Sequence, residues 1–184
     1  MKKLFVVSLL ILMIATTGFA SETPGAAGAL AQETYTIEDM LHYAIQDEWL
    51  AEAEYTALME EFQVTRPFSN IQRAELTHID LLLPLFESYE IEFPEKPDLA
   101  IIPETLEETY QIGVDAEIAN IAMYEKFLAN PTLPADISSV FTRLMNASKN
   151  HLNAFQRQVD RGREGFSNQG NQFGRGRQNR RSQF

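Results

Sequence analysis

Four stretches of this chain repeat apolar side chains at intervals of three and four residues, the spacing of one face of an α-helix. The expected helices cover residues 37–62, 70–89, 106–128 and 136–161. No stretch shows the alternation of apolar and polar residues that indicates a half-buried strand. The sequence therefore predicts an all-α protein, a four-helix bundle formed by residues 36–162.

Capping residues, prolines and one glycine mark the expected ends and interruptions of these helices. Three N-termini have the spacing of a capping box, namely Thr36 with Asp39, Ser69 with Gln72, and Thr105 with Glu108. Pro84 predicts a kink or an early end of the second helix, and Gly113 predicts a break in the third. Residues 91–104 are proline-rich; fully extended they span about 45 Å, whereas a long bundle helix is about 30 Å. This crossover makes helices two and three parallel.

The N-terminus has the three-part pattern of a secretory signal peptide. Lys2 and Lys3 precede an apolar run at residues 4–15, and Gly18 and Ala20 stand at positions −3 and −1 of a cleavage site. The run is shorter than the roughly 20 residues of a spanning helix. We therefore expect an exported protein (periplasmic, cell-envelope or extracellular) with no membrane span after signal cleavage at residue 20; an uncleaved anchor is the alternative.

The segments that flank the expected bundle differ from it in composition. Residues 21–35 are small, with proline and glycine, and predict a flexible leader. Residues 163–184 are rich in glycine, arginine, asparagine and glutamine, and predict a disordered tail. We expect this tail to be a solubilising segment; the alternatives are contact with an anionic envelope polymer and folding back on the acidic bundle.

The net charge of −11 is unevenly distributed: residues 35–156 hold nearly all the acidic residues and only six lysines or arginines, whereas the segment after Arg157 is basic. An acidic body argues against nucleic acid as a partner. The chain has no cysteine, which excludes disulfides, thiolate metal sites and cysteine nucleophiles. Any metal must be held by oxygen and nitrogen, and these ligands suit iron, manganese or zinc.

Five polar residues interrupt the apolar faces of the expected helices: Glu48, Glu75, His78, Glu117 and His151. Carboxylates and imidazoles are rarely buried without a partner, because desolvating an unpaired charge is costly. Gathered in one core, the carboxylates would repel one another unless protons or a cation intervened. Glu75 and His78 are three positions apart and can face one ion. The pattern indicates a carboxylate–histidine metal site; the alternative is a bundle in which carboxylates pair with histidines and no metal binds.

Several neighbours of these residues have two readings. Glu52 and Asn120 could supply a further ligand or a hydrogen bond to one, and for Glu52 a position facing solvent is the preferred reading. Tyr55 and Tyr124 lie two turns beyond Glu48 and Glu117; they are expected as core residues, with an electron-transfer or hydrogen-bonding role as the alternative. The remaining acids of the first helix predict a solvated face, formed by Asp47, Glu52, Glu54, Glu60 and Glu61.

Four segments resemble ferritin-like proteins, and they read DEWLAEAEY, NIQRAELTHIDLL, IGVDAEIANI and LMNASKNHLNAF. Over roughly residues 37–160 the chain is most similar to a family of ferritin-like domains, often exported, that is catalogued as a domain of unknown function. The resemblance implies a ferritin-like four-helix fold and metal-ligand roles for Glu48, Glu75, His78, Glu117 and His151. Ser148 stands where the full di-iron pattern has a glutamate. One firmly held ion with a weaker second is therefore an alternative to a symmetric pair.

The resulting expectation is an exported ferritin-like protein that binds one or two iron ions, with manganese or zinc as other candidates. Its chemistry, by analogy with the superfamily, would be an oxidation by dioxygen or peroxide at an open coordination position. The alternative is a non-catalytic envelope binding or structural module with a vestigial or structural metal site. We expect a monomer or a dimer.

Overall fold

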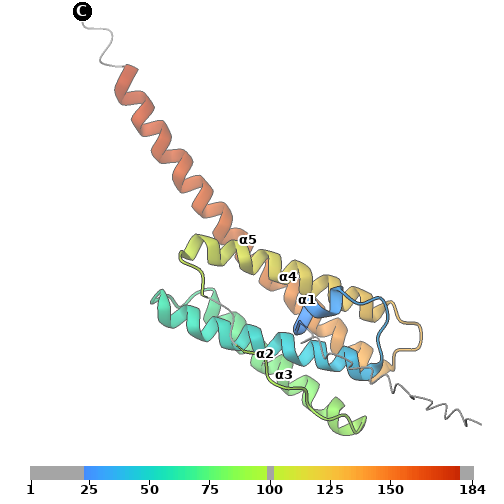
Figure 1. Cartoon of the computed structure of the whole chain (residues 1–184). Coiled ribbons are helices and arrows are strands. Elements are labelled where there is room, and N and C mark those ends of the chain that lie inside the picture. Colours follow the sequence, from blue (N-terminus) through green and yellow to red (C-terminus); the bar gives the residue numbers. More distant parts are fainter. Residues whose placement is uncertain (1–22, 99–101, 179–184) are drawn as a thin grey trace, which may run out of the picture.

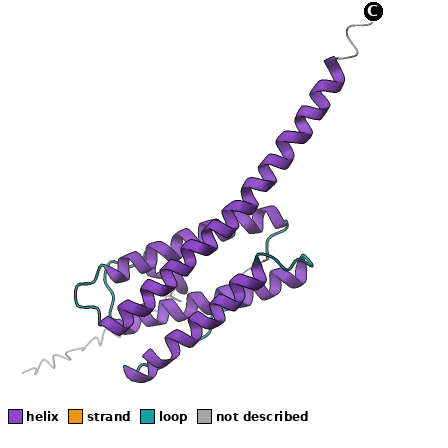
Figure 2. Ribbon diagram, turned by 180° about the vertical axis from the view of Figure 1, so that it is seen from behind, coloured by secondary structure: helices purple, strands orange, loops and turns teal. Residues whose placement is uncertain are grey.

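A computed structural model of the chain describes residues 23–98 and 102–178, with side chains as far as residue 163. The regular elements in these residues are all helices (Figure 2). They are α1 (Gly25–Leu30), α2 (Ile37–Glu61), α3 (Phe68–Ser88), α4 (Leu106–Leu128) and α5 (Ala135–Gln178). The predicted all-α bundle is therefore confirmed.

Two antiparallel helix pairs, α2 with α3 and α4 with α5, form the bundle (Figure 1). Contacts between α3 and α5 join the pairs. The connection from α3 to α4, described except for residues 99–101, runs back along the bundle, so that α3 and α4 point the same way (Figure 1). No described helix is both long and apolar enough to cross a membrane.

The helix starts follow the predicted caps at two of three positions. Thr36 Oγ1 accepts the backbone N–H of Asp39 at 3.0 Å, and the Asp39 carboxylate accepts the Thr36 N–H at 2.7 Å. Thr105 caps α4 through its hydroxyl, which accepts the backbone N–H of Glu108, but the described hydrogen bonds lack the return bond from the Glu108 side chain that a full capping box has. The predicted box at Ser69 is wrong, because α3 starts at Phe68 and has no side-chain cap. Pro67 stands before it with φ of −82°, already suited to a helix, so the helix begins before Ser69.

Two apolar clusters fill the bundle, one on each side of the five buried polar residues. The larger cluster includes Leu41, Ile45, Leu82, Phe127 and Phe141. The smaller cluster has as its buried members Tyr55, Leu58, Phe68, Ile71, Val114 and Phe155. Along α2, α3, α4 and α5 the polar residues fall between members of these two clusters. The polar layer is thus closed at both ends by hydrocarbon, which limits its contact with water.

Neither Pro84 nor Gly113 ends the helix in which it lies. α3 continues past Pro84 to Ser88, and α4 runs through Gly113 without a break. Gly113 has a packing role, because a Cβ atom at this position would lie 3.0 Å from the ring of Phe155. That approach lets the aromatic ring fill the space between α4 and α5.

We expect Gly113→Ala to lower the melting temperature, because the added methyl group must displace the packed ring of Phe155. Gly162→Ala is the matched control, since a Cβ there meets nothing within 4 Å. Alanine is the better helix former by about 1 kcal/mol, so the control should be neutral or stabilising. The free energies of unfolding of the two variants, measured with urea, should differ by about 1–3 kcal/mol. Equal stabilities would show that α4 and α5 do not pack at this distance.

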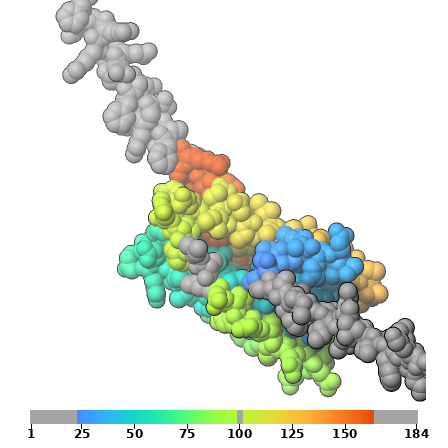
Figure 3. Space-filling model, viewed as in Figure 1, coloured from blue at the N-terminus to red at the C-terminus, as the bar shows by residue number. Residues whose placement is uncertain are grey.

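The predicted flexible leader is wrong for residues 25–30, which form α1 and pack on the bundle. Ala26 and Ala29 are buried, and the N–H of Ala26 donates to Asp47 at 2.8 Å. Small side chains make this close docking feasible, as at Gly28, where a Cβ would lie 2.9 Å from the Tyr43 ring. Figure 3 shows α1 against α2 and α4 on one face of the molecule.

The predicted end of the last helix near residue 162 also differs from the structure. α5 continues to Gln178 and leaves the bundle (Figure 1). No proline interrupts residues 135–178, and a helix that extends an existing one needs no new nucleation step. The rest of the predicted tail, residues 179–184, and the predicted signal peptide lie outside the described residues.

Candidate metal centre

All five polar residues singled out from the sequence meet in the middle of the bundle. Glu48 comes from α2, Glu75 and His78 from successive turns of α3, Glu117 from α4 and His151 from α5. Their relative exposure is between 3% and 8%. A set of three carboxylates and two imidazoles is therefore almost fully removed from solvent.

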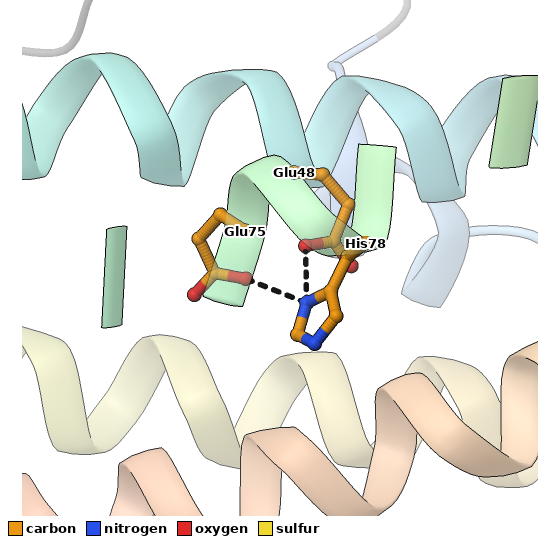
Figure 4. Close-up of side chains that lie close together, drawn as sticks. All are labelled: Glu48, Glu75 and His78. Carbon is orange, nitrogen blue, oxygen red and sulfur yellow. Dashed lines mark hydrogen bonds and ion pairs between the residues drawn. The ribbon is translucent and has the colours of Figure 1, made fainter. Parts of the chain in front are cut away.

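The first group of ligand atoms belongs to Glu48, Glu75 and His78. Nδ1 of His78 lies 3.0 Å from Oε2 of Glu48 and 2.8 Å from Oε2 of Glu75. Figure 4 shows both carboxylates directed at the same edge of the imidazole ring. The arrangement places three donor atoms from two adjacent helices around one point.

The second group consists of Glu75, Glu117 and His151. Nδ1 of His151 lies 3.2 Å from Oε1 of Glu75 and 3.3 Å from Oε1 of Glu117. Glu75 thus directs one carboxylate oxygen at each histidine. The two imidazole rings stack, with their centroids 5.9 Å apart.

The spacing of these atoms fits two neighbouring cation positions that share Glu75. Within each group, one ligand atom from each residue lies within 4.8 Å of the others. Two donors bound at about 2.1 Å to an octahedral ion are about 3.0 Å apart when adjacent, close to the observed nitrogen–oxygen separations. Three protein ligands per ion would also leave coordination positions open. The donor set of oxygen and nitrogen suits iron, manganese or zinc.

Protons hold the cluster together when no cation is bound. Burial opposes the charge of His78, but its hydrogen bonds to Glu48 and Glu75 raise its pKa to about 10. The pKa of His151 rises to about 9 for the same reason, through Glu117 and Glu75. Burial alone would raise the pKa of Glu75, yet hydrogen bonds from His151 and His78 lower it to about 2. Glu75 is therefore an anion between two imidazolium rings.

The two outer carboxylates behave differently from Glu75. Burial raises the pKa of Glu48 well above its usual range and that of Glu117 to about 7, with the nearby histidines opposing the shift. Burial therefore opposes the charge of both outer carboxylates. A metal ion must displace protons from these groups and from the imidazoles, so its affinity should rise with pH.

Two tyrosines connect the outer carboxylates across the bundle. Tyr124 of α4 donates to Oε1 of Glu48 at 3.0 Å, and Tyr55 of α2 donates to Oε1 of Glu117 at 3.4 Å. Both α2 and α4 therefore carry a glutamate followed seven positions later by a tyrosine, and each tyrosine donates a hydrogen bond to the glutamate of the other helix. Burial raises the pKa of both phenols well above 10, so they remain donors. Both are core residues, as expected, and both also bond to a candidate ligand.

Asn120 and Ser148 form a separate hydrogen-bond chain beside the two groups. Ser148 Oγ donates to Oδ1 of Asn120 at 2.7 Å, and Asn120 Nδ2 donates to the Asp47 carboxylate, which also accepts the N–H of Ala26. Ser148 stands where a further glutamate would complete the di-iron pattern. It makes a neutral hydrogen bond to Asn120 instead, and Asn120 is connected through Asp47 to α1. Asn120 is buried but bonds none of the five candidate ligands in the described interactions.

A cavity of about 200 Å³ lies between α1, α2 and α4 and reaches the centre. Its wall includes Glu48, Glu75 and Glu117, and also Asp47 and Glu54. The predicted solvated face is therefore wrong for Asp47, which is half-buried and bonded by Ala26 of α1 and Asn120 of α4, and for Glu54, which is half-buried in the cavity wall. Burial raises the pKa of Glu54 to about 7. Sequence spacing gave no sign of this covering, since it depends on the docking of α1.

Fold and site together define a helical-bundle protein with a buried carboxylate–histidine cluster. The chain belongs to the family described as an uncharacterized protein domain, DUF2202, which it matches over residues 37–172. That span contains the bundle and all five clustered residues. A family of unknown function was the expectation from the sequence, and it is confirmed.

One relative is similar over more than half of the chain. This is "Uncharacterized protein MJ0754" of Methanocaldococcus jannaschii, 31% identical over 132 residues that cover 62% of this chain and 70% of the relative. No solved structure matches the chain with significance. The chemistry of the site must therefore be argued from its own geometry.

Proposed function

We propose that this chain is a metal-dependent oxidoreductase of ferritin-like type, which holds one or two iron ions and reacts with dioxygen or peroxide. The observation that carries the proposal is the pair of three-residue ligand groups that share Glu75. A buried set of three carboxylates and two imidazoles is costly to desolvate, and cation binding offsets that cost. Manganese or zinc would fit the same donors.

The residues of this chain would bind, shield and supply protons to the reaction. Glu48, Glu75 and His78 would hold one ion, while Glu75, Glu117 and His151 would hold the second. Bound ferrous ions would supply two electrons, which with two protons reduce dioxygen to hydrogen peroxide or hydrogen peroxide to two waters. The 200 Å³ cavity gives a small oxidant access to the carboxylates. Glu54 in its wall, with its pKa near 7, can hold or release a proton at neutral pH.

We further propose that the protein is exported, on the basis of the charged and apolar N-terminal pattern. Mass spectrometry of protein recovered from outside the cytoplasm should show a chain that begins at Ser21. A chain that retains Met1 and sediments with membranes would contradict cleavage.

The test of the function is the addition of ferrous iron to metal-free protein under air and under argon. We expect binding of one to two equivalents and, only under air, an absorbance change faster than iron oxidation in buffer. Metal analysis of protein from its native compartment should show more than about half an equivalent of iron, manganese or zinc. Binding without accelerated oxidation would leave a structural metal site, and neither binding nor oxidation would overturn the proposal.

A further inference from the structure

A second cavity, of about 350 Å³, lies where the turn before α3 meets α5. Its polar lining residues are Arg66, Asn70, His151, Arg157, Gln158 and Arg161. Three of them, His151, Gln158 and Arg161, follow one another at spacings of seven and three on α5 and so share one face of that helix. The cavity thus has a floor that is part of the candidate metal centre and a rim of arginines.

The charge of this cavity is opposite to that of the molecule as a whole. The chain has a net charge of −11, yet the cavity is lined by three arginines and by no carboxylate. Among side chains that the structure describes, none of the ion pairs involves these arginines. α3 also begins here with no acidic residue in its first turn, and the N-terminal end of a helix carries partial positive charge. Such a cluster favours an anion, because the arginines otherwise repel one another.

His151 links the cavity to the buried cluster. Its Nδ1 faces Glu75 and Glu117 at 3.2 and 3.3 Å. No described hydrogen bond involves Nε2 of His151, and no buried polar side-chain atom in the described part lacks a partner, so Nε2 retains contact with solvent. The cavity lined by His151 supplies that contact. A histidine that binds metal through one nitrogen usually donates its other N–H to an acceptor, often an anionic one.

We propose that this cavity binds a small, multiply charged oxyanion of the phosphate type, held by Arg66, Arg157 and Arg161 and hydrogen-bonded by Nε2–H of His151. Guanidinium groups recognise phosphate through paired hydrogen bonds. A cavity of 350 Å³ holds such an ion together with several waters, each of which occupies about 30 Å³. Binding requires neither a metal nor the proposed oxidoreductase activity. A bound anion would fix the orientation of His151 toward Glu75 and Glu117.

The test is a calorimetric titration of inorganic phosphate into the full chain, freed of metal with a chelating resin so that no soluble chelator competes. The variant is Arg157→Gln with Arg161→Gln, and the matched control is Arg143→Gln, an exposed arginine on the same helix that does not line the cavity. We expect the double variant to bind phosphate at least about tenfold more weakly and the control to bind as the unaltered chain does. All three proteins should show the same helical circular dichroism.

A second measurement reports on the histidine itself. The Nε2 nuclear magnetic resonance signal of His151, assigned by its loss in His151→Gln, should shift with phosphate in the unaltered chain and stay in place in the double variant. Equal phosphate affinities of the double variant and the control, or an unmoved His151 signal at saturating phosphate, would overturn the site. Tighter binding of malonate than of phosphate would overturn the assignment to a phosphate-type ion. Phosphate binding to a chain that fails to oxidise iron would leave this inference intact.

Discussion

Glu75→Gln should abolish metal binding at one position, weaken it at the other, and destabilise the metal-free protein. Glu75 directs one oxygen at each histidine, whereas a glutamine has a single carbonyl oxygen and can serve only one group. The substitution also removes the anion between two imidazolium rings, and loss of one partner from a buried ion pair costs about 3–5 kcal/mol. Metal content per chain should fall from one or two equivalents to below about half, and the melting temperature of the metal-free chain should fall as well.

The matched control for this substitution is Glu87→Gln. It makes the same chemical change at an exposed position of α3, well away from the cluster. Metal content and stability should match those of the unaltered chain. A Glu75→Gln protein that still binds two equivalents would show that the two groups do not depend on a shared carboxylate.

Raising the pH from about 6.5 to 10 should progressively destabilise the metal-free protein. The folded pKa values of His78 and His151, about 10 and about 9, lie above the usual value of 6.5. Their contribution to stability is therefore complete below pH 6.5 and is lost as the pH rises through 9 to 10, by up to about 1.4 kcal/mol per pH unit for each histidine. Glu117, with its pKa raised to about 7, acts in the same direction between pH 4.5 and 7.

The acid side of the profile depends on Glu75. Its folded pKa of about 2 lies below the usual 4.5, so its contribution is present above pH 4.5 and is lost as the pH falls toward 2. Urea unfolding of resin-treated protein between pH 2 and 10 measures how the free energy of unfolding depends on pH. His42→Gln is the control, because His42 lies outside the cluster and its ring forms a hydrogen bond with the backbone carbonyl of Glu92. A metal-free protein that becomes more stable between about pH 7 and 9 would contradict the proton-held cluster. Metal-loaded protein should show the reverse trend, since metal binding displaces protons.

The sequence was sufficient to find the bundle and the clustered residues because both follow from short-range spacing. Glu48, Glu117 and His151 each fall on the apolar face of a helix, and a charged side chain there needs a partner wherever the helix packs. Glu75 and His78 share a face whatever the tertiary structure. Their convergence then required only that four amphipathic helices bury their apolar faces together.

Other features could not be predicted from the sequence because they depend on contacts between distant segments. α1 has only six residues and no apolar period, and its docking relies on small side chains that look like a linker. Asp47 looked solvated because nothing in α2 indicates that α1 covers it. The arginine-lined cavity joins Arg66 to residues about ninety positions later in the chain, and no local pattern relates them.

The two ligand groups divide unequally between the helix pairs. Glu48, Glu75 and His78 all lie on α2 and α3, whereas the second group takes Glu75 from α3 and the other two residues from α4 and α5. An ion in the second position would therefore link the pair α2 and α3 to the pair α4 and α5, whereas an ion in the first position would not. The two helix pairs can separate only when this ion dissociates, so its dissociation rate would limit how fast the bundle opens.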